Sequence, residues 1–260
     1  MLLPVRQMLE KHNCAAHVTI RRKKSLPTWF WLNFSMNLVW SANLWFWPKF
    51  FKKRNQPQGP TILIDTFVSL ASVDERGHFH DRLYGDLTER AGPTTPFEIW
   101  HSPTWSDLPT PWSTIKLLRR IARGPNNILV HAKWLSLKHY VYAITQSVKL
   151  PTSISLVPEW RGLPMYSLVH EELAKDKGSF TLTQSILGYC FIGELKKNKV
   201  HLIGVIDWFE NQAADRALNL AMKNFFPGVK TKGYMGILFE GFSAAYVPTQ
   251  LEYNKGTLPD

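Results

Sequence analysis

Short apolar runs alternate with longer amphipathic stretches from residue 60 to the end of the chain. The runs are rich in β-branched side chains and are bounded by Pro, Gly or Asn: TILID (61–65), FEIWH (97–101), NILVH (127–131), SISLVPE (153–159), VHLIGVID (200–207) and VKTKGYMG (229–236). Runs of this length and composition predict buried strands, and the last run is the weakest match.

The stretches between these runs show the apolar spacing that is typical of helices. They are TIKLLRRIAR (114–123), AKWLSLKHYVYAITQSV (132–148), MYSLVHEELAKDKG (165–178), TLTQSILGYCFIGELKK (181–197) and AADRALNLAMKNFF (213–226). Ser113 is expected to cap the first helix and Gly124 to end it. Residues 127–131 stay ambiguous between a strand and the first turn of the next helix. The alternation predicts an α/β fold, with a Rossmann-like parallel sheet and flanking helices.

A charge-free segment of 24 residues, 25–48, precedes this body and contains five of the 11 tryptophans. Basic clusters, RRKK and KFFKKR, flank it on both sides. Its length permits a membrane-spanning helix. However, Asn33, Asn37 and Asn43 would all need partners inside lipid, and tryptophan favours the headgroup level. A helix that lies in the membrane interface fits this composition better.

The net charge of +11 belongs almost entirely to the front of the chain. Residues 1–60 hold ten Lys or Arg against one Glu, which is +9 and leaves +2 for the rest. Because the aromatic run and the basic clusters do not interleave, we favour an anionic membrane over a nucleic acid as the partner. We therefore predict a basic, Trp-rich membrane-associating segment (1–58) before a globular domain (59–260). The alternatives are an aromatic-rich helix packed on the domain and a basic nucleic-acid binder.

Ionisable residues stand at the ends of most predicted strands. Ligands of doubly wound sheets bind beyond the carboxyl ends of the strands, so one rim is expected to gather Asp65, His101, His131, Glu159, Asp207 and Glu210. Such a rim can deprotonate a hydroxyl or stabilise a developing cation. Each residue also has a structural explanation, since Asp207 can cap the next helix and Asn211 and Gln212 can satisfy its free amides.

Other kinds of chemistry find little support in the sequence. No zinc-ligand spacing, phosphate-binding glycine loop or recognisable Ser-His-Asp arrangement is present. The two cysteines, Cys14 and Cys190, are far apart and indicate a reducing compartment rather than a disulfide framework.

Three blocks of sequence resemble the N-terminal half of bacterial surface-carbohydrate glycosyltransferases. They are IDTFVS…DERGHFHDRLYGDL (64–87), VIDWFENQAADRALNLAMKNFFPGVKTKGYMG (205–236) and YVPTQLEYNKGTLPD (246–260). The resemblance implies the GT-B architecture, in which two Rossmann-like halves surround a cleft. It also implies transfer of a sugar from a nucleotide-activated donor to a lipid-linked or polysaccharide acceptor. The place of this reaction would be the cytoplasmic face of the cell membrane, and no bound metal ion would be required.

The resemblance also implies which residues form the site. Asp207 and Glu210 are expected to be catalytic, one as base toward an acceptor hydroxyl or as the carboxylate that faces the anomeric carbon. The expected substrate-binding residues are Asp65, Asp81, Arg82, His101, Glu159, Asn211, Gln212 and Asp215. No metal ligand and no cofactor besides the nucleotide-sugar substrate is expected.

The C-terminal half of a GT-B enzyme usually supplies most of the nucleotide contacts, and this half is expected on a continuing reading frame or on a partner chain. The competing hypothesis is a non-catalytic, membrane-peripheral module that binds the acceptor, or a degenerate enzyme fragment.

Overall fold

The computed structural model describes most of the chain from Leu26 onward. The described residues are 26–51, 56–85, 87–91, 95–106, 110–124, 127–149, 159–160, 163–164, 166–235 and 249–260. The first basic cluster, at 21–24, and most of the run at 153–159 lie outside them.

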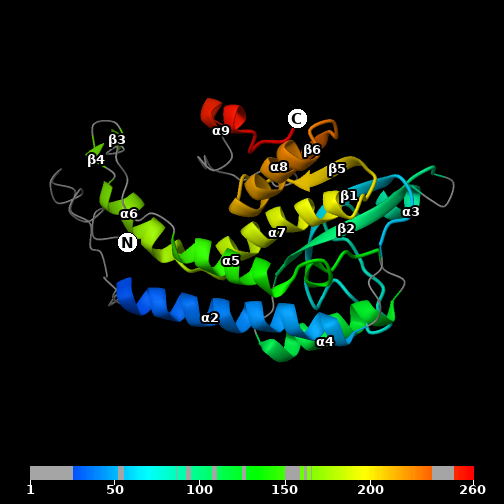
Figure 1. Ribbon diagram of the computed structural model, residues 1–260, viewed down its shortest axis with the longest axis horizontal. Coiled ribbons are helices and arrows are strands. Elements are labelled where there is room, and N and C mark those ends of the chain that lie inside the picture. The colour runs from blue at the N-terminus through cyan, green and yellow to red at the C-terminus, as the bar shows by residue number, and fades with distance from the viewer. Residues whose placement is uncertain are drawn as a thin grey trace.

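A four-stranded parallel sheet forms the centre of the domain (Figure 1). Its strands are β1 (Thr61–Val68), β2 (Glu98–Trp105), β5 (Leu202–Trp208) and β6 (Thr231–Tyr234). They lie in the order β2-β1-β5-β6, and every neighbouring pair is parallel. The prediction of an α/β, Rossmann-like parallel sheet flanked by helices is confirmed.

The strand order reverses between β1 and β5. The chain leaves β1 to place β2 on one side, and it leaves β5 to place β6 on the other. The point where the strand order reverses, beyond the carboxyl ends of the strands, is the usual ligand position in such sheets.

Helices cover both faces of the sheet. The helical elements are α2 (Leu26–Phe46), η1 (Trp47–Phe50), α3 (Leu87–Ala91), α4 (Pro111–Arg123), η2 (His131–Lys133), α5 (Leu137–Val148), α6 (Tyr166–Asp176), α7 (Phe180–Lys197), α8 (Ala213–Phe225) and α9 (Gln250–Lys255). Leu63 of β1 and Val205 of β5 are buried in one cluster with residues of α7 and α8, whereas Val68 of β1 packs with Leu117 of α4. Because successive side chains of a strand point to opposite faces, α7 and α8 cover one face and α4 covers the other.

Helix α2 packs on the domain, beside α4, α5, α6 and α7, and Figure 1 shows it (blue) along one side of the molecule. Asn37 is fully buried, and its amide Nδ2 donates to the Gly178 carbonyl at 3.0 Å and to Thr183 Oγ1 at 2.8 Å. Asn33 donates to the carbonyl of Lys175 at 2.6 Å. These asparagines, which would need partners in lipid, thus have partners inside the protein. The alternative of an aromatic-rich helix packed on the domain is confirmed for the described part of the segment.

The outer face of α2 is apolar and exposed. Trp31 is 62% exposed, Met36 50% and Val39 48%, and Phe50 of η1 is 66% exposed. Within the described ranges no helix is both long enough and apolar enough to cross a membrane.

Several local predictions need correction. Strand β1 continues to Val68 and β2 to Trp105, so Asp65 and His101 lie inside their strands and not at the ends. Residues 127–131 form no regular strand: Ile128 makes an isolated parallel bridge to His101, and His131 begins η2. Thr110, not Ser113, is the N-cap of α4, because Pro111 takes the first helical position, where its missing N–H costs nothing.

The prediction that Glu159 stands on the rim is wrong. Glu159 begins the two-residue strand β3 (Glu159–Trp160), which pairs antiparallel with β4 (Leu163–Pro164) in a separate small sheet. His131 also has a core role, because its ring stacks on Phe191 and its Nε2 lies 3.0 Å from Ser102 Oγ. Burial lowers the pKa of His131 to about 3, which keeps its ring neutral.

Candidate functional site

Two aspartates occupy neighbouring positions at the strand-order reversal. Ile64 of β1 is paired with Ile206 of β5, so Asp65 and Asp207 follow at the next position of each strand. Each lies two residues after a core residue of the α7–α8 face, and therefore points to that face. One carboxylate oxygen of Asp65, one of Asp207 and one of Asp215 all lie within 4.8 Å of one another. We call these three residues the aspartate cluster.

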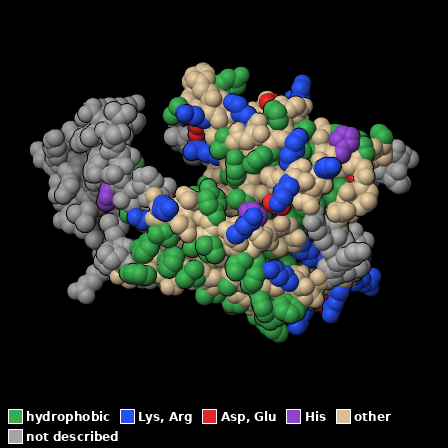
Figure 2. Space-filling model, in the orientation of Figure 1, with side chains coloured by type: hydrophobic (Ala, Val, Ile, Leu, Met, Phe, Trp, Pro, Cys, Tyr) green, Lys and Arg blue, Asp and Glu red, His purple; other side chains and the backbone are tan. Residues whose placement is uncertain are grey.

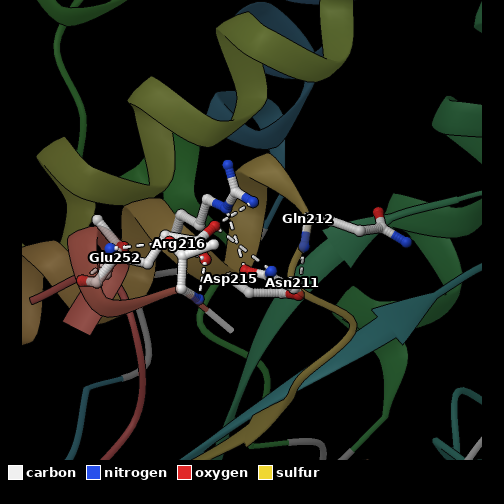
Figure 3. A network of polar contacts seen from close by, with 7 residues as sticks. Asn211, Gln212, Asp215, Arg216 and Glu252 are labelled. Carbon is white, nitrogen blue, oxygen red and sulfur yellow. Dashed lines mark hydrogen bonds and ion pairs between the residues drawn. The ribbon is translucent and has the colours of Figure 1, made fainter. Parts of the chain in front are cut away.

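Asp215 reaches the cluster from the first turn of α8 (Figure 3). Its Oδ2 accepts hydrogen bonds from the main-chain N–H of Glu210 at 2.8 Å and of Gln212, the N-cap residue, at 2.9 Å. A carboxylate at this place satisfies free amides and faces the positive end of the helix. The capping chemistry predicted for this region is thus present, but Asp215 supplies it and not Asp207.

Asp207 is held by a different donor. Its side chain has no exposed surface, and its Oδ2 accepts a hydrogen bond from Asn219 Nδ2 at 2.7 Å. Asn219 Nδ2 also donates to the carbonyl of Asp215 at 2.9 Å, which fixes the orientation of the amide. The other oxygen, Asp207 Oδ1, has no hydrogen-bond partner among the described residues. A buried, unpartnered carboxylate oxygen is costly unless it is protonated or meets a ligand.

The carboxyls of the cluster hold protons more tightly than free aspartates do. Burial, followed by repulsion from Asp215, raises the pKa of Asp65 from 3.8 to about 7, although Thr104 Oγ1 donates to its Oδ1 at 3.3 Å. Burial and the charges of Asp65 and Asp215 raise the pKa of Asp207 well above 3.8. Burial raises the pKa of Asp215 to about 6 against its main-chain hydrogen bonds. The causes are those expected where like charges share a buried site.

A fourth aspartate, Asp81, lies close to a histidine, His101, on the α4 face of the sheet. Asp81 accepts hydrogen bonds from Thr66 Oγ1 at 3.3 Å and from the main-chain N–H of Leu83 at 2.9 Å. Its Oδ2 lies 3.7 Å from His101 Nε2, and neither of these buried atoms has a hydrogen-bond partner among the described residues. Burial lowers the pKa of His101, although the charge of Asp81 opposes that shift. Repulsion from Asp81 also contributes to the raised pKa of Asp65, so the two groups are near enough to interact.

Three aromatic rings stand next to these carboxyls. Tyr84 lies 5.9 Å from Trp208 and 5.8 Å from Tyr234 between ring centroids, and Trp208 lies 5.5 Å from Tyr234. Burial and the charges of Asp65 and Asp207 raise the pKa of the Tyr84 hydroxyl, which therefore stays protonated. This hydroxyl has no hydrogen-bond partner within the described part of the chain. It is a donor available to a ligand.

Glu210 lies in the loop between β5 and α8 and is partly exposed. Trp208 Nε1 donates to its Oε1 at 2.6 Å, and Gln212 Nε2 donates to its Oε2. Its main-chain N–H binds Asp215, as described above. One donor on each oxygen fixes the orientation of this carboxylate at the edge of the cluster.

The neighbouring residue Asn211 has a structural role. It is buried and has a left-handed backbone with φ of 56°, a conformation that asparagine tolerates better than most residues. Arg216 Nε donates to its Oδ1 at 3.1 Å, and Arg216 also forms an ion pair with Glu252 of α9 (Figure 3). These contacts tie the C-terminal helix to the loop that carries Glu210.

The structure thus brings together part of the predicted site. Asp65, Asp207 and Asp215 meet, with Glu210 and Gln212 beside them. Asp81 is near enough to Asp65 to interact with it, but its partner His101 lies on the opposite face of the sheet, and Glu159 belongs to another sheet. Arg82 is exposed.

The sequence reasoning missed Thr104, Asn219 and the hydroxyl of Tyr84. Asn219 had a usable signal, because it is a polar residue on the apolar face of α8, four positions after Asp215. Thr104 and Tyr84 had no such signal in the sequence, because their places depend on strand register and on the path of a loop.

Comparison with protein-family models, with curated proteins and with solved structures finds no match for this chain.

Substitution of Asp65 by Asn tests the raised pKa values. The folded protein holds a proton on Asp65 between about pH 4 and 7 that the unfolded chain releases, so stability falls as the pH rises through this range. We expect Asp65→Asn to raise the free energy of unfolding by about 1 to 3 kcal/mol at pH 8 and by less than about 0.5 kcal/mol at pH 4. Denaturant unfolding with a chelator present measures both values.

Glu75→Gln is the matched control, since the Glu75 side chain is 85% exposed. It should leave the pH dependence unchanged. An identical pH dependence for Asp65→Asn and the wild type would show that Asp65 titrates as an ordinary carboxyl.

Proposed function

We propose that this chain is the acceptor-side half of a GT-B-type glycosyltransferase of bacterial surface polysaccharide synthesis. It would transfer a sugar from a nucleotide-activated donor to a lipid-linked or polysaccharide acceptor, together with a second, nucleotide-binding half. The observation that carries the proposal is the position of the aspartate cluster and Glu210. They lie beside the strand-order reversal of a Rossmann-like sheet, where such sheets bind ligands.

We assign Glu210 as the general base that accepts the proton of the acceptor hydroxyl. It is partly exposed, and Trp208 and Gln212 fix its orientation, so a hydroxyl can approach it without rearrangement of the core. A general base needs this geometry first of all. The fully buried Asp207 lies one layer deeper, and we assign to it a contribution to the negative potential that stabilises a developing cation at the anomeric carbon.

The aromatic rings supply a surface for the sugar. Tyr234 is 50% exposed and Tyr84 is partly exposed, and both rings pack against the buried Trp208. The buried Tyr84 hydroxyl adds a hydrogen-bond donor. Apolar faces combined with a few fixed polar groups are the usual composition of small-molecule sites.

Glu210→Gln should lower sugar transfer by at least about 100-fold, since it removes the base and keeps the shape of the side chain. The assay follows the transfer of label from a panel of radiolabelled nucleotide sugars to lipid-linked saccharides in bacterial membranes. It is run with the chain together with its second, nucleotide-binding half. Glu194→Gln, on α7, is the control and should keep full activity, because Glu194 pairs with His139 and Lys197 outside the site.

Wild-type rates in Glu210→Gln would reject the assigned base. Absence of transfer from every donor by the wild-type assembly would reject the proposed reaction and favour an acceptor-binding module.

We further propose that the chain binds the cytoplasmic face of the membrane through the outer surface of α2 and α5. Figure 2 shows hydrophobic side chains (green) gathered over these helices. The exposed apolar residues on them include Trp31, Met36, Val39, Leu137 and Val141. Exposed apolar side chains that gather over neighbouring helices in this way often mark a binding surface for a protein or a membrane.

Exposed cations on α5 and on α4, both of which pack beside α2, make an anionic lipid surface the partner that we favour. Lys138 lies on α5, and Arg119 of α4 holds its guanidinium 5.6 Å from the ring of Trp112, which is 65% exposed. Apolar side chains that enter the headgroup layer, with basic residues around them, are typical of interfacial binding.

The triple variant Trp31→Ser, Met36→Ser and Val39→Ser should bind anionic vesicles roughly 100-fold more weakly, because the three exposed side chains contribute roughly 1 kcal/mol each, or roughly 3 kcal/mol together. Vesicle flotation measures the partition. Deletion of residues 1–56 is unsuitable, since it would remove the buried Asn37 and Leu44 from the interior.

The matched control replaces three exposed apolar residues elsewhere, in Ile203→Ser, Leu251→Ser and Tyr253→Ser. It should float like the wild type. Equal flotation of the two triple variants would show that the α2 face is not the attachment surface. Binding of the wild type to an oligonucleotide but not to vesicles would favour the nucleic-acid alternative.

A further inference from the structure

We propose that the aspartate cluster binds a hard divalent cation of the Mg²⁺ or Mn²⁺ class. The first support is geometric. One oxygen from each of Asp65, Asp207 and Asp215 lies within 4.8 Å of the others. Two oxygens on one ion stand at most twice the metal–oxygen distance apart, roughly 4.2 Å for Mg²⁺ and roughly 5 Å for Ca²⁺, so these oxygens can converge on a single ion with small movements of their side chains.

The second support is independent of the clustering. Asp207 is fully buried, yet its Oδ1 has no hydrogen-bond donor among the described residues. Asn219 occupies the other oxygen from a fixed direction, which leaves Oδ1 on the remaining side of the carboxylate. An unsatisfied buried oxygen of this kind requires a proton or a cation.

Neighbouring groups orient the three carboxylates in the way that metal ligands are usually held. Thr104 donates to Asp65, Asn219 donates to Asp207, and the main chain at Glu210 and Gln212 donates to Asp215. Outer donors of this kind fix the direction of ligand oxygens and tune their affinity. The ligands come from two strands and one helix, which are among the rigid parts of the fold.

The charge balance supports the same conclusion. The cluster gathers three carboxyls at one largely buried place, and their hydrogen-bond donors are a hydroxyl, an amide and main-chain N–H groups rather than basic side chains. A divalent ion would offset two of the three negative charges. An all-oxygen set of carboxylates selects hard ions over zinc or copper, which favour nitrogen and sulfur ligands.

The inferred ion goes beyond the proposed sugar transfer and does not depend on it. It also departs from the expectation, drawn from the resemblance, that no bound metal ion is required. The three carboxylates leave coordination positions for other oxygen ligands. If the proposed function holds, phosphate oxygens of the donor nucleotide are the class of group that would fill them, and this last step rests on that function.

Isothermal titration of the chelator-treated full-length chain with MnCl₂ at pH 7.5 tests the site, with no nucleotide or sugar present. We expect one binding event in the wild type and at least about tenfold weaker binding in Asp207→Asn and in Asp215→Asn. Glu75→Gln is the control for a surface carboxylate and should bind like the wild type. Competition with MgCl₂ and CaCl₂ then identifies the preferred ion.

Thermal unfolding of the same proteins supplies a second measurement. Asn retains an acceptor oxygen for Asn219, so Asp207→Asn should fold without the ion, whereas MnCl₂ should raise the Tm of the wild type and not that of the variant. Equal Mn²⁺ affinity in the wild type and both variants, or no binding at millimolar MnCl₂, would overturn the proposal. Because no sugar enters the experiment, a failure to bind Mn²⁺ would not argue against the proposed sugar transfer. In the same way, a failure of sugar transfer would not argue against the cation site.

Discussion

The parallel register of β1 and β5 is the constraint on which the site depends. Main-chain hydrogen bonds between these strands place Asp65 and Asp207 at adjacent positions on one face, at the point where the strand order reverses. Helix α8 starts after the short loop 209–212 that follows β5, so its first turn brings a third carboxyl, Asp215, to the same place. The burial that completes the core therefore also concentrates negative charge, which the fold tolerates at a cost in stability, as is common at functional sites.

Helix α2 has one side packed on the domain and one side exposed. Its inner stripe is polar enough to form specific contacts, since Asn37 and Ser41 are buried and hydrogen-bonded, while its outer stripe is apolar and exposed. The same helix thus closes the domain and presents the surface that we propose for the membrane. Both proposed roles place a membrane-borne acceptor and the carboxyl-lined edge of the sheet on one small domain.

The sequence predicted the fold better than the site. Strand and helix types followed from apolar spacing, and the parallel sheet predicted that Asp65 and Asp207 lie close together, although β1 continues three residues beyond Asp65. Three features could not be predicted from the spacing: the limits of β2, the separate sheet of Glu159 and the cap at Thr110. They depend on which strands pair and on competition between nearby capping residues. For α2, apolar residues occur all around the helix, so spacing alone could not show which side packs on the domain. The partners of Asn37 show which side is buried.

The central claim is that Asp65 and Asp207 share one buried site and repel each other when ionised. A double-mutant cycle of Asp65→Asn and Asp207→Asn, followed by denaturant unfolding with a chelator present, measures this repulsion directly. At pH 8 we expect the double variant to gain less stability than the sum of the two single variants, by about 1 kcal/mol, and we expect this difference to vanish at pH 4, where both groups are protonated. Additive effects at both pH values would contradict the account, because they would mean that the two carboxyls do not interact.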